Sequence, residues 1–170
     1  MRIGIGYDAH RLEKGRPLML AGVRVPFEWG LQGHSDGDVI IHAVIDALLG
    51  AAGLPDIGAQ FPDTDPQYKD ISSLVLLRRA GEMVGAAGFV TINVDTTLLA
   101  EAPRIASHVD TMRACLGEAL GIAAGQVGVK AKTGEGMGFV GRKEGMAAMA
   151  VALLEGSLQD ARPEGGKARV

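Results

Sequence analysis

The apolar pattern of the chain is densest over residues 36–53, where Val, Ile, Leu and Ala fill most positions. Three polar side chains interrupt it at intervals of four: Asp38, His42 and Asp46. Residues four apart lie one turn apart on the same face of a helix. A helix this apolar packs into a core, so the pattern predicts a buried helix whose polar stripe faces water, a partner or a ligand.

The hydrophobic periodicity of the rest of the chain predicts an alternation of strands and helices. The expected strands cover residues 2–10, 89–100, 126–132 and 146–154, with a short hairpin at 18–26 around Ala21 and Gly22. The expected helices cover residues 72–87, capped by Ser72 or Ser73 and ended by Gly88, and residues 103–120, with Pro103 in the first turn and Gly121 at the end. Residues 54–68, with three prolines and three aspartates, predict a loop.

No internal repeat or linker divides this succession of elements. We therefore expect one α+β domain over residues 1–157, with a mixed β-sheet and helices packed on one of its faces. A chain of 170 residues is long enough to build such a core. Residues 158–170, which include RPEGGKARV, are polar and rich in charge and glycine, so we expect a disordered tail.

Composition and charge narrow the class of protein. Seventeen basic and twenty acidic residues give a net charge of −3, which offers no basic surface for nucleic acid or anionic lipid. The first residues do not resemble a secretory signal, and no apolar run reaches the roughly 18 residues of a membrane span. Cys115, the single cysteine, cannot form an intrachain disulfide, and we expect it to fill space in a helix. These features favour a cytoplasmic protein.

A candidate metal site follows from the first strand. Asp8 and His10 are two residues apart, so both project from one face of that strand. With His42 they make a set of one carboxylate and two imidazoles, which zinc accepts while keeping a fourth position open. Asp46 is a candidate to support a ligating imidazole by accepting its N–H. The spacing alone leaves the alternative open that these are hydrogen-bonded core histidines.

Two glycine-rich segments are candidates for binding phosphate. His34 and Ser35 precede the apolar helix, where unpaired amides and a partial positive charge suit an anion. Ser35 and Asp36 could equally serve as the cap of that helix. The second segment, KTGEGMGFVGR at residues 132–142, follows a strand but fits no Walker or dinucleotide pattern. Its amides could cradle a phosphate, or the segment could simply be a turn.

Four stretches together carry a resemblance to a known family: GYDAHRL, GHSDGDVIIHAVIDALLGAAGLPDIGAQFPDTDP, LLAEAPRI and VKAKTGEGMGFVGR. In their order and spacing across residues 1 to about 155 they resemble the 2-C-methyl-D-erythritol 2,4-cyclodiphosphate synthase family. The resemblance implies a homotrimer whose sheets face the threefold axis and whose active sites lie between neighbouring subunits.

The reaction implied by the resemblance converts 4-diphosphocytidyl-2-C-methyl-D-erythritol 2-phosphate into the cyclic diphosphate and releases CMP. The 2-phosphate attacks the β-phosphorus of the same molecule, so the protein has to fold the substrate back and neutralise charge. Two other functions remain as alternatives. One is a zinc-dependent phosphohydrolase, in which a metal-bound hydroxide attacks; the other is a non-catalytic module that binds isoprenoid diphosphates.

The resemblance also implies roles for single residues. Asp8, His10 and His42 match zinc ligands, one ion per chain, and Glu135 matches the carboxylate that holds a second divalent ion, Mg²⁺ or Mn²⁺. His34 and Thr133 match groups that stabilise the transition state, with Glu135 as a third catalytic residue. The residues implied to bind substrate, with the last two near an isoprenoid diphosphate on the axis, are Asp8, His10, His34, Ser35, Asp56, Ile57, Gly58, Phe61, Pro62, Asp63, Thr64, Asp65, Ala100, Glu101, Ala102, Pro103, Arg104, Ile105, Ala106, Lys132, Thr133, Gly134, Glu135, Phe139 and Arg142.

Overall fold

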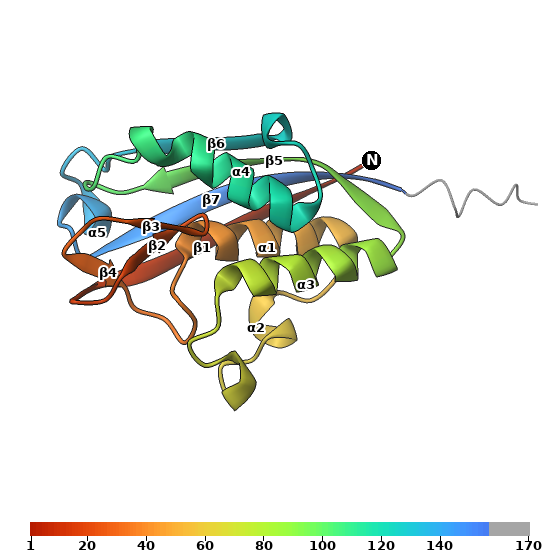
Figure 1. Ribbon diagram of the computed structural model, residues 1–170, viewed down its shortest axis with the longest axis horizontal. Coiled ribbons are helices and arrows are strands. Elements are labelled where there is room, and N and C mark those ends of the chain that lie inside the picture. The colour runs from red at the N-terminus through yellow and green to blue at the C-terminus, as the bar shows by residue number, and fades with distance from the viewer. Residues whose placement is uncertain (157–170) are drawn as a thin grey trace, which may run out of the picture.

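A five-stranded mixed sheet forms the base of the molecule in the computed structural model, which describes residues 1–156 (Figure 1). Its strands, in spatial order, are β4 (Trp29–Leu31), β1 (Arg2–Lys14), β7 (Gly145–Gly156), β5 (Phe89–Leu99) and β6 (Val127–Lys132). All neighbours are antiparallel except β5 and β6, which are parallel. A separate hairpin joins β2 (Leu18–Leu20) to β3 (Val23–Val25). The predicted tail, residues 158–170, lies outside the described residues.

Three long helices cover one face of this sheet (Figure 1). They are α1 (Val39–Ala52), α3 (Ser73–Ala86) and α4 (Val109–Leu120). Helix α1 packs on β1 and β7, α4 lies over β6, and α3 bridges the two helices. The short elements are α2 (Ile57–Gln60), α5 (Gly138–Gly141) and the 3₁₀ turns η1 (Pro66–Tyr68), η2 (Ala106–His108) and η3 (Ala124–Gln126). The predicted α+β fold, with helices on one face of a mixed sheet, is confirmed.

Two glycines of β1 allow α1 to lie directly on the strand. A Cβ at Gly4 would stand 2.0 Å from the carbonyl oxygen of Ala47, and one at Gly6 would stand 1.9 Å from that of Ala43. Neither distance is physically accessible, so a side chain at either position would push the helix away. The close approach brings Asp8, the next residue on the same face of β1, up to His42 near the start of α1.

The helix begins at a different residue from the one expected. Asp38, and neither Ser35 nor Asp36, is the N-cap of α1, and its side chain accepts a hydrogen bond from the backbone N–H of Ile41 at 3.1 Å. The reason is a contact with the hairpin: the same carboxylate accepts from the amides of Ala21 at 2.9 Å and Gly22 at 2.7 Å. The predicted start at residue 36 was therefore wrong. Asp38 serves the fold and does not join His42 in a polar stripe.

A second correction concerns the predicted helix over residues 103–120. Helix α4 begins at Val109, so Pro103 is not in its first turn. The preceding segment is held against the glycine-rich loop, because the amide of Ala100 donates to the carbonyl of Lys132 at 3.0 Å. Strand β4 and helices α2 and α5 were missed, since three or four residues are too few to show a hydrophobic period. The predicted end of α4 at Gly121 is confirmed by its left-handed conformation.

The face of the sheet turned away from the helices is apolar and open. Its exposed large side chains are Ile3, Ile5 and Tyr7 on β1 and Met149 and Val151 on β7, with exposed fractions from 43% to 73%. The register pairs Ile5 with Val151 and Tyr7 with Met149, which makes the side chains one continuous surface. Among residues 1–156, no helix is both long and apolar enough to span a bilayer.

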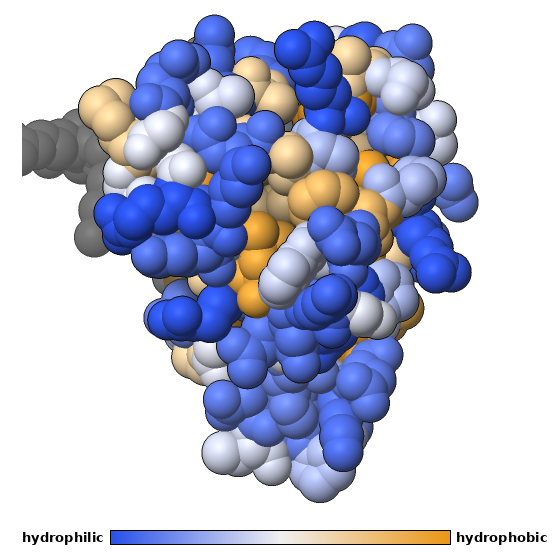
Figure 2. Space-filling model, turned by 90° about the vertical axis from the view of Figure 1, so that its left-hand side faces the viewer, coloured by the Kyte–Doolittle hydropathy of each residue, from blue (hydrophilic) through white to orange (hydrophobic). Residues whose placement is uncertain are grey.

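The surface at the end of the molecule that carries β4 and α5 has both apolar and hydrophilic areas (Figure 2). Apolar residues gather near the middle of this view, and hydrophilic ones surround them. A cavity of about 270 Å³ opens at these elements; its walls are mainly apolar, with Leu12, Phe27, Trp29, Val140 and Met146, and also include Glu28, Glu101 and Lys143. The lower part of the view, where α2 and η1 lie, is almost wholly hydrophilic, which suits a segment that meets solvent or a polar ligand.

Candidate metal centre and active site

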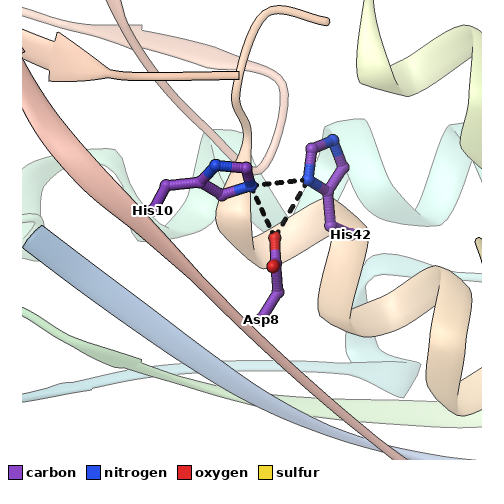
Figure 3. A group of neighbouring side chains, drawn as sticks. All are labelled: Asp8, His10 and His42. Atoms are coloured by element: carbon purple, nitrogen blue, oxygen red, sulfur yellow. Dashed lines mark hydrogen bonds and ion pairs between the residues drawn. The ribbon is translucent and has the colours of Figure 1, made fainter. Parts of the chain in front are cut away.

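Asp8 and His10 from β1 converge with His42 from α1 (Figure 3). The Oδ2 of Asp8 lies 2.7 Å from the Nε2 of His10 and 3.0 Å from the Nδ1 of His42. The two ring nitrogens lie 3.0 Å from each other. Only 11% to 26% of each side chain is exposed, so the group is half-buried with one open side. The structure thus brings together the three residues that the sequence predicts as metal ligands.

In both imidazoles, the ring nitrogen that points away from the three-residue group also has a hydrogen-bond partner. The Nδ1 of His10 lies 2.5 Å from the carbonyl oxygen of Gln32, which only accepts, so this nitrogen carries a proton and Nε2 is the nitrogen available to a metal ion. The Nε2 of His42 lies 3.1 Å from the hydroxyl of Ser35 and 3.0 Å from that of Ser73. Asp46 does not play the predicted supporting role: its carboxylate accepts from the amide of Ile57 at 2.8 Å.

The donor set fits a divalent cation. A zinc ion about 2.0–2.1 Å from each donor, with tetrahedral angles, would separate the donors by about 3.3 Å, a few tenths more than observed. Burial acts to raise the pKa of Asp8, but the bonds and charges of His10 and His42 outweigh it and hold that pKa well below its usual range. Burial of His10 acts to lower its pKa, but the bond to Asp8 and its charge raise it. The carboxylate is therefore ionised and strongly favours a positive charge beside it.

A cavity of about 480 Å³ opens above these three side chains. Six further predicted residues line it, namely His34, Ser35, Ile57, Gly58, Phe61 and Asp63. Tyr68 and Leu76 also line it and were not predicted. Tyr68 packs edge-on against Phe61, with ring centroids 5.6 Å apart. An aromatic residue beside an acidic, proline-rich loop was the available signal for Tyr68; Leu76 gave none, because it follows an ordinary helical pattern.

The loop over this cavity is organised by aspartate caps. Asp56 accepts from the amide of Ala59 at 2.9 Å at the start of α2, and Asp65 accepts from the amide of Gln67 at 3.0 Å at the start of η1. Pro62 and Thr64 belong to the same loop between these two turns. The segment predicted as a loop therefore contains two short helical turns that shape it.

The other predicted residues form a second cluster at the ends of β5 and β6. The hydroxyl of Thr133 donates to the Oε1 of Glu135 at 2.5 Å. The side chain of Glu101 accepts from the amides of Gly134 at 2.9 Å and Gly136 at 3.3 Å. These bonds join the segment 100–106 to the glycine-rich loop.

Within one chain the two clusters remain apart. The register places Ala9, Ala147, Leu99 and Lys132 in one row across β1, β7, β5 and β6. Three strand spacings of about 4.8 Å separate the ends of this row by about 14 Å. One protomer therefore does not unite Thr133 and Glu135 with its own Asp8, His10 and His42.

Phe139 and Arg142 occupy a third place, at α5. Phe139 lines a cavity of about 370 Å³ with Ala9, Arg11 and Gly145 among its other walls. The guanidinium of Arg142 pairs with Glu144, with Nε and Oε1 2.8 Å apart. His10 of the first cluster lines the same cavity as Phe139.

Comparison with known proteins identifies the family of the chain. The sequence profile of the YgbB family matches residues 1–155. A 2-C-methyl-D-erythritol 2,4-cyclodiphosphate synthase of Desulfosudis oleivorans is 57% identical over 166 residues, which cover 97% of this chain and 99% of that protein. One of Dehalococcoides mccartyi is 56% identical over 155 residues, or 91% and 99% of the two chains.

A solved structure shows the same fold. The CDP-bound form of a 2C-methyl-D-erythritol-2,4-cyclodiphosphate synthase matches with a TM-score of 0.84 at 40% identity, over 91% of this chain and 100% of that one. The predicted resemblance is confirmed over nearly the whole length of the chain. Fold, site and sequence agree, and the chain belongs to the 2-C-methyl-D-erythritol 2,4-cyclodiphosphate synthase (YgbB) family.

Proposed function

We propose that this protein converts 4-diphosphocytidyl-2-C-methyl-D-erythritol 2-phosphate into 2-C-methyl-D-erythritol 2,4-cyclodiphosphate and CMP, in the non-mevalonate pathway of isoprenoid synthesis in the cytoplasm. The observation that carries the proposal is the convergence of Asp8, His10 and His42 on the wall of an open cavity, in a chain 57% identical to a named synthase. A solved relative binds CDP, which shares the cytidine and diphosphate of the proposed substrate.

The proposed reaction balances without water. An oxygen of the 2-phosphate bonds to the β-phosphorus, and the bond from that phosphorus to the bridging oxygen breaks. CMP leaves with the bridging oxygen, and the ring of the cyclic diphosphate closes. Because the nucleophile belongs to the substrate, the protein has to position two phosphates and stabilise their charge.

Asp8, His10 and His42 would hold a zinc ion, which when bound supplies a positive charge that polarises phosphate oxygens. His34 lines the same cavity, where its imidazole would donate to a phosphate. In the second cluster, the Thr133 hydroxyl would stabilise the developing charge on phosphate oxygens. Glu135 would hold Mg²⁺ or Mn²⁺, since its exposed carboxylate is a hard oxygen donor.

The organic parts of the substrate have proposed places as well. Residues 56–58 at the start of α2 would meet the ribose and the methylerythritol, and residues 61–65 would cover them. The segment 100–106 would receive the cytosine through backbone groups, with Lys132 and Gly134 beside the phosphates. The cavity is lined by Ile57, Gly58 and Phe61, which supports the place proposed for the ribose and the methylerythritol.

The complete site would require more than one copy of the chain. We propose a homotrimer in which the sheets face the threefold axis and the second cluster of one protomer completes the cavity of its neighbour. Two features support this assembly: Ala9 and Lys132, beside the two clusters, end a row of four strands that spans about 14 Å in one chain, and the face of β1 and β7 is apolar and open. Phe139 and Arg142 would then lie near the axis and meet an isoprenoid diphosphate.

Product identification tests the proposed function. Purified protein, stripped with EDTA and reloaded with zinc and magnesium, is incubated with the cytidine diphosphate substrate, and the products are identified by mass. We expect CMP and the cyclic diphosphate, with no turnover in the stripped protein. Linear phosphates as products would instead establish the phosphohydrolase, and binding without any turnover would establish a non-catalytic module.

A further inference from the structure

A chain of buried and partly buried hydrogen bonds leads outward from His42. Its Nε2 lies 3.0 Å from the hydroxyl oxygen of Ser73, a side chain with no solvent exposure. The Ser73 hydroxyl donates in turn to the carboxylate of Asp36, whose other oxygen accepts from the Ser73 amide at 3.0 Å. We propose that Ser73 and Asp36 are positioning residues that fix His42 in the tautomer that binds metal. The inference rests on the metal site of the proposed function.

The direction of each bond follows from what each group can donate. A carboxylate only accepts, and a serine hydroxyl has one proton. Since the Ser73 hydroxyl gives its proton to Asp36, its oxygen is left to accept from His42. The network thus assigns the imidazole proton to Nε2. The lone pair of Nδ1 then faces Asp8 and His10, as a metal ligand requires.

The two histidines of the site are oriented by different means. A backbone carbonyl, that of Gln32, fixes the proton of His10. For His42, the group that fixes the proton is the Ser73 side chain. The other hydroxyl near its Nε2 is that of Ser35, which accepts from the amide of Gly37 at 3.3 Å and can still either donate to His42 or accept from it. The tautomer of His42 therefore depends on Ser73 and Asp36.

The same chain lies at the starts of two helices. The carboxylate of Asp36 is bound to Ser73 at the first turn of α3, and Asp38 is the residue that caps α1. The N-cap of α3 is Ser72, which is exposed and makes no side-chain cap bond. Ser73 is buried and faces the metal site, whereas its neighbour Ser72 faces solvent, which provides a matched control.

The test measures zinc affinity of the full-length protein without substrate, by competition with a chromophoric chelator. For Ser73→Ala we expect zinc affinity to fall about 10- to 100-fold, the usual effect of removing an outer partner of a ligating histidine. Asp36→Asn keeps the side-chain volume but its amide donates to Ser73, which releases the hydroxyl proton toward His42 and favours the wrong tautomer. We expect a loss of the same order there, and no change for Ser72→Ala.

Two further readouts make the result decisive. The visible spectrum of the cobalt-substituted protein should change in Ser73→Ala and Asp36→Asn. Thermal unfolding identifies which variants are folded. If Ser73→Ala is unfolded, the zinc affinity and spectrum of Asp36→Asn test the inference. Wild-type zinc affinity and spectrum in the folded variants would overturn the inference. His42→Ala separates the proposed metal site from the proposed positioning role. If His42→Ala also binds zinc like the wild type, the proposed metal site is wrong. If His42→Ala loses zinc while Ser73→Ala and Asp36→Asn keep it, only the positioning role of Ser73 and Asp36 is wrong.

Discussion

At the scale of single residues, the proposed reaction has to overcome the repulsion between negatively charged phosphates. Bringing the 2-phosphate against a diphosphate places like charges about 4 Å apart, and each pair repels by about 4 kcal/mol at an effective dielectric of about 20. Each 1.36 kcal/mol left uncompensated costs about tenfold in rate. In the proposed reaction, a cation at Asp8, His10 and His42 would neutralise part of this charge, and a second cation would be needed for the rest.

Glu135 is the residue expected to hold that second cation. We predict that Glu135→Gln retains zinc and fold but loses about a hundredfold in turnover, partly recovered by excess magnesium or manganese. Turnover measured against divalent concentration checks this, with Glu118→Gln, an exposed substitution on α4, as the matched control. A near-normal rate for Glu135→Gln at low divalent concentration would contradict the two-metal assignment.

The ligand set could be predicted from the sequence, but the residues behind it could not. Asp8 and His10 share a strand face by their spacing, and His42 stands out in an apolar helix. Ser73 meets both His42 and Asp36 only because α3 begins beside the start of α1, and Asp36 and Ser73 are 37 residues apart in the chain. Asp46 has favourable helical spacing from His42, yet it bonds to Ile57.

At the scale of elements, the site depends on how closely α1 lies on β1. A methyl group at Gly6 would collide with the backbone of Ala43, the neighbour of His42. We predict that Gly6→Ala displaces the helix, lowers stability by about 1–3 kcal/mol and weakens zinc binding at least about tenfold. Thermal unfolding and zinc titration measure both effects.

The matched control for this prediction lies in the same helix. A Cβ at Gly50 of α1 meets no other atom within 4 Å. Gly50→Ala should leave zinc binding unchanged and stabilise the helix by up to about 1 kcal/mol. If Gly6→Ala and Gly50→Ala behave alike, close packing of α1 on β1 is not what positions His42.

The long elements could be predicted because each has enough residues to show its period. Helix α3 and strands β5, β6 and β7 appear where the pattern places them. The errors occur where a contact between residues far apart in the sequence determines where an element begins. Asp38 caps α1 because it also binds the amides of the β2–β3 turn, and α4 begins late because Ala100 at the start of the preceding segment binds the glycine-rich loop and the 3₁₀ turn η2 comes first.

At the scale of the whole molecule, the open apolar face of the sheet is the feature that a single chain leaves unexplained. Ile3, Ile5, Tyr7, Met149 and Val151 form one surface on adjacent strands. Exposed apolar patches of this kind mark sites of protein association. A net charge of −3 gives no reason to assign the face to an anionic partner.

We predict that Ile5→Glu dissociates the proposed trimer, because it places a charge in the buried interface. Sedimentation should then show a mass near the 17.7 kDa of one chain in place of three times that value. The variant should lose activity but retain zinc, since all three ligands belong to one chain. Thr111→Glu, exposed on α4, is the control. A wild-type protein that is a stable and active monomer at micromolar concentration would contradict the assembly.

The central claim is that the substrate's own phosphate, and not water, attacks the β-phosphorus. The reaction run in water labelled with ¹⁸O, with zinc and magnesium present, tests it most directly. Intramolecular transfer forms and breaks only bonds within the substrate, so we predict that mass spectrometry finds no label in either CMP or the cyclic diphosphate. A phosphate product that carries ¹⁸O from the solvent would contradict the account and show that the cavity activates water.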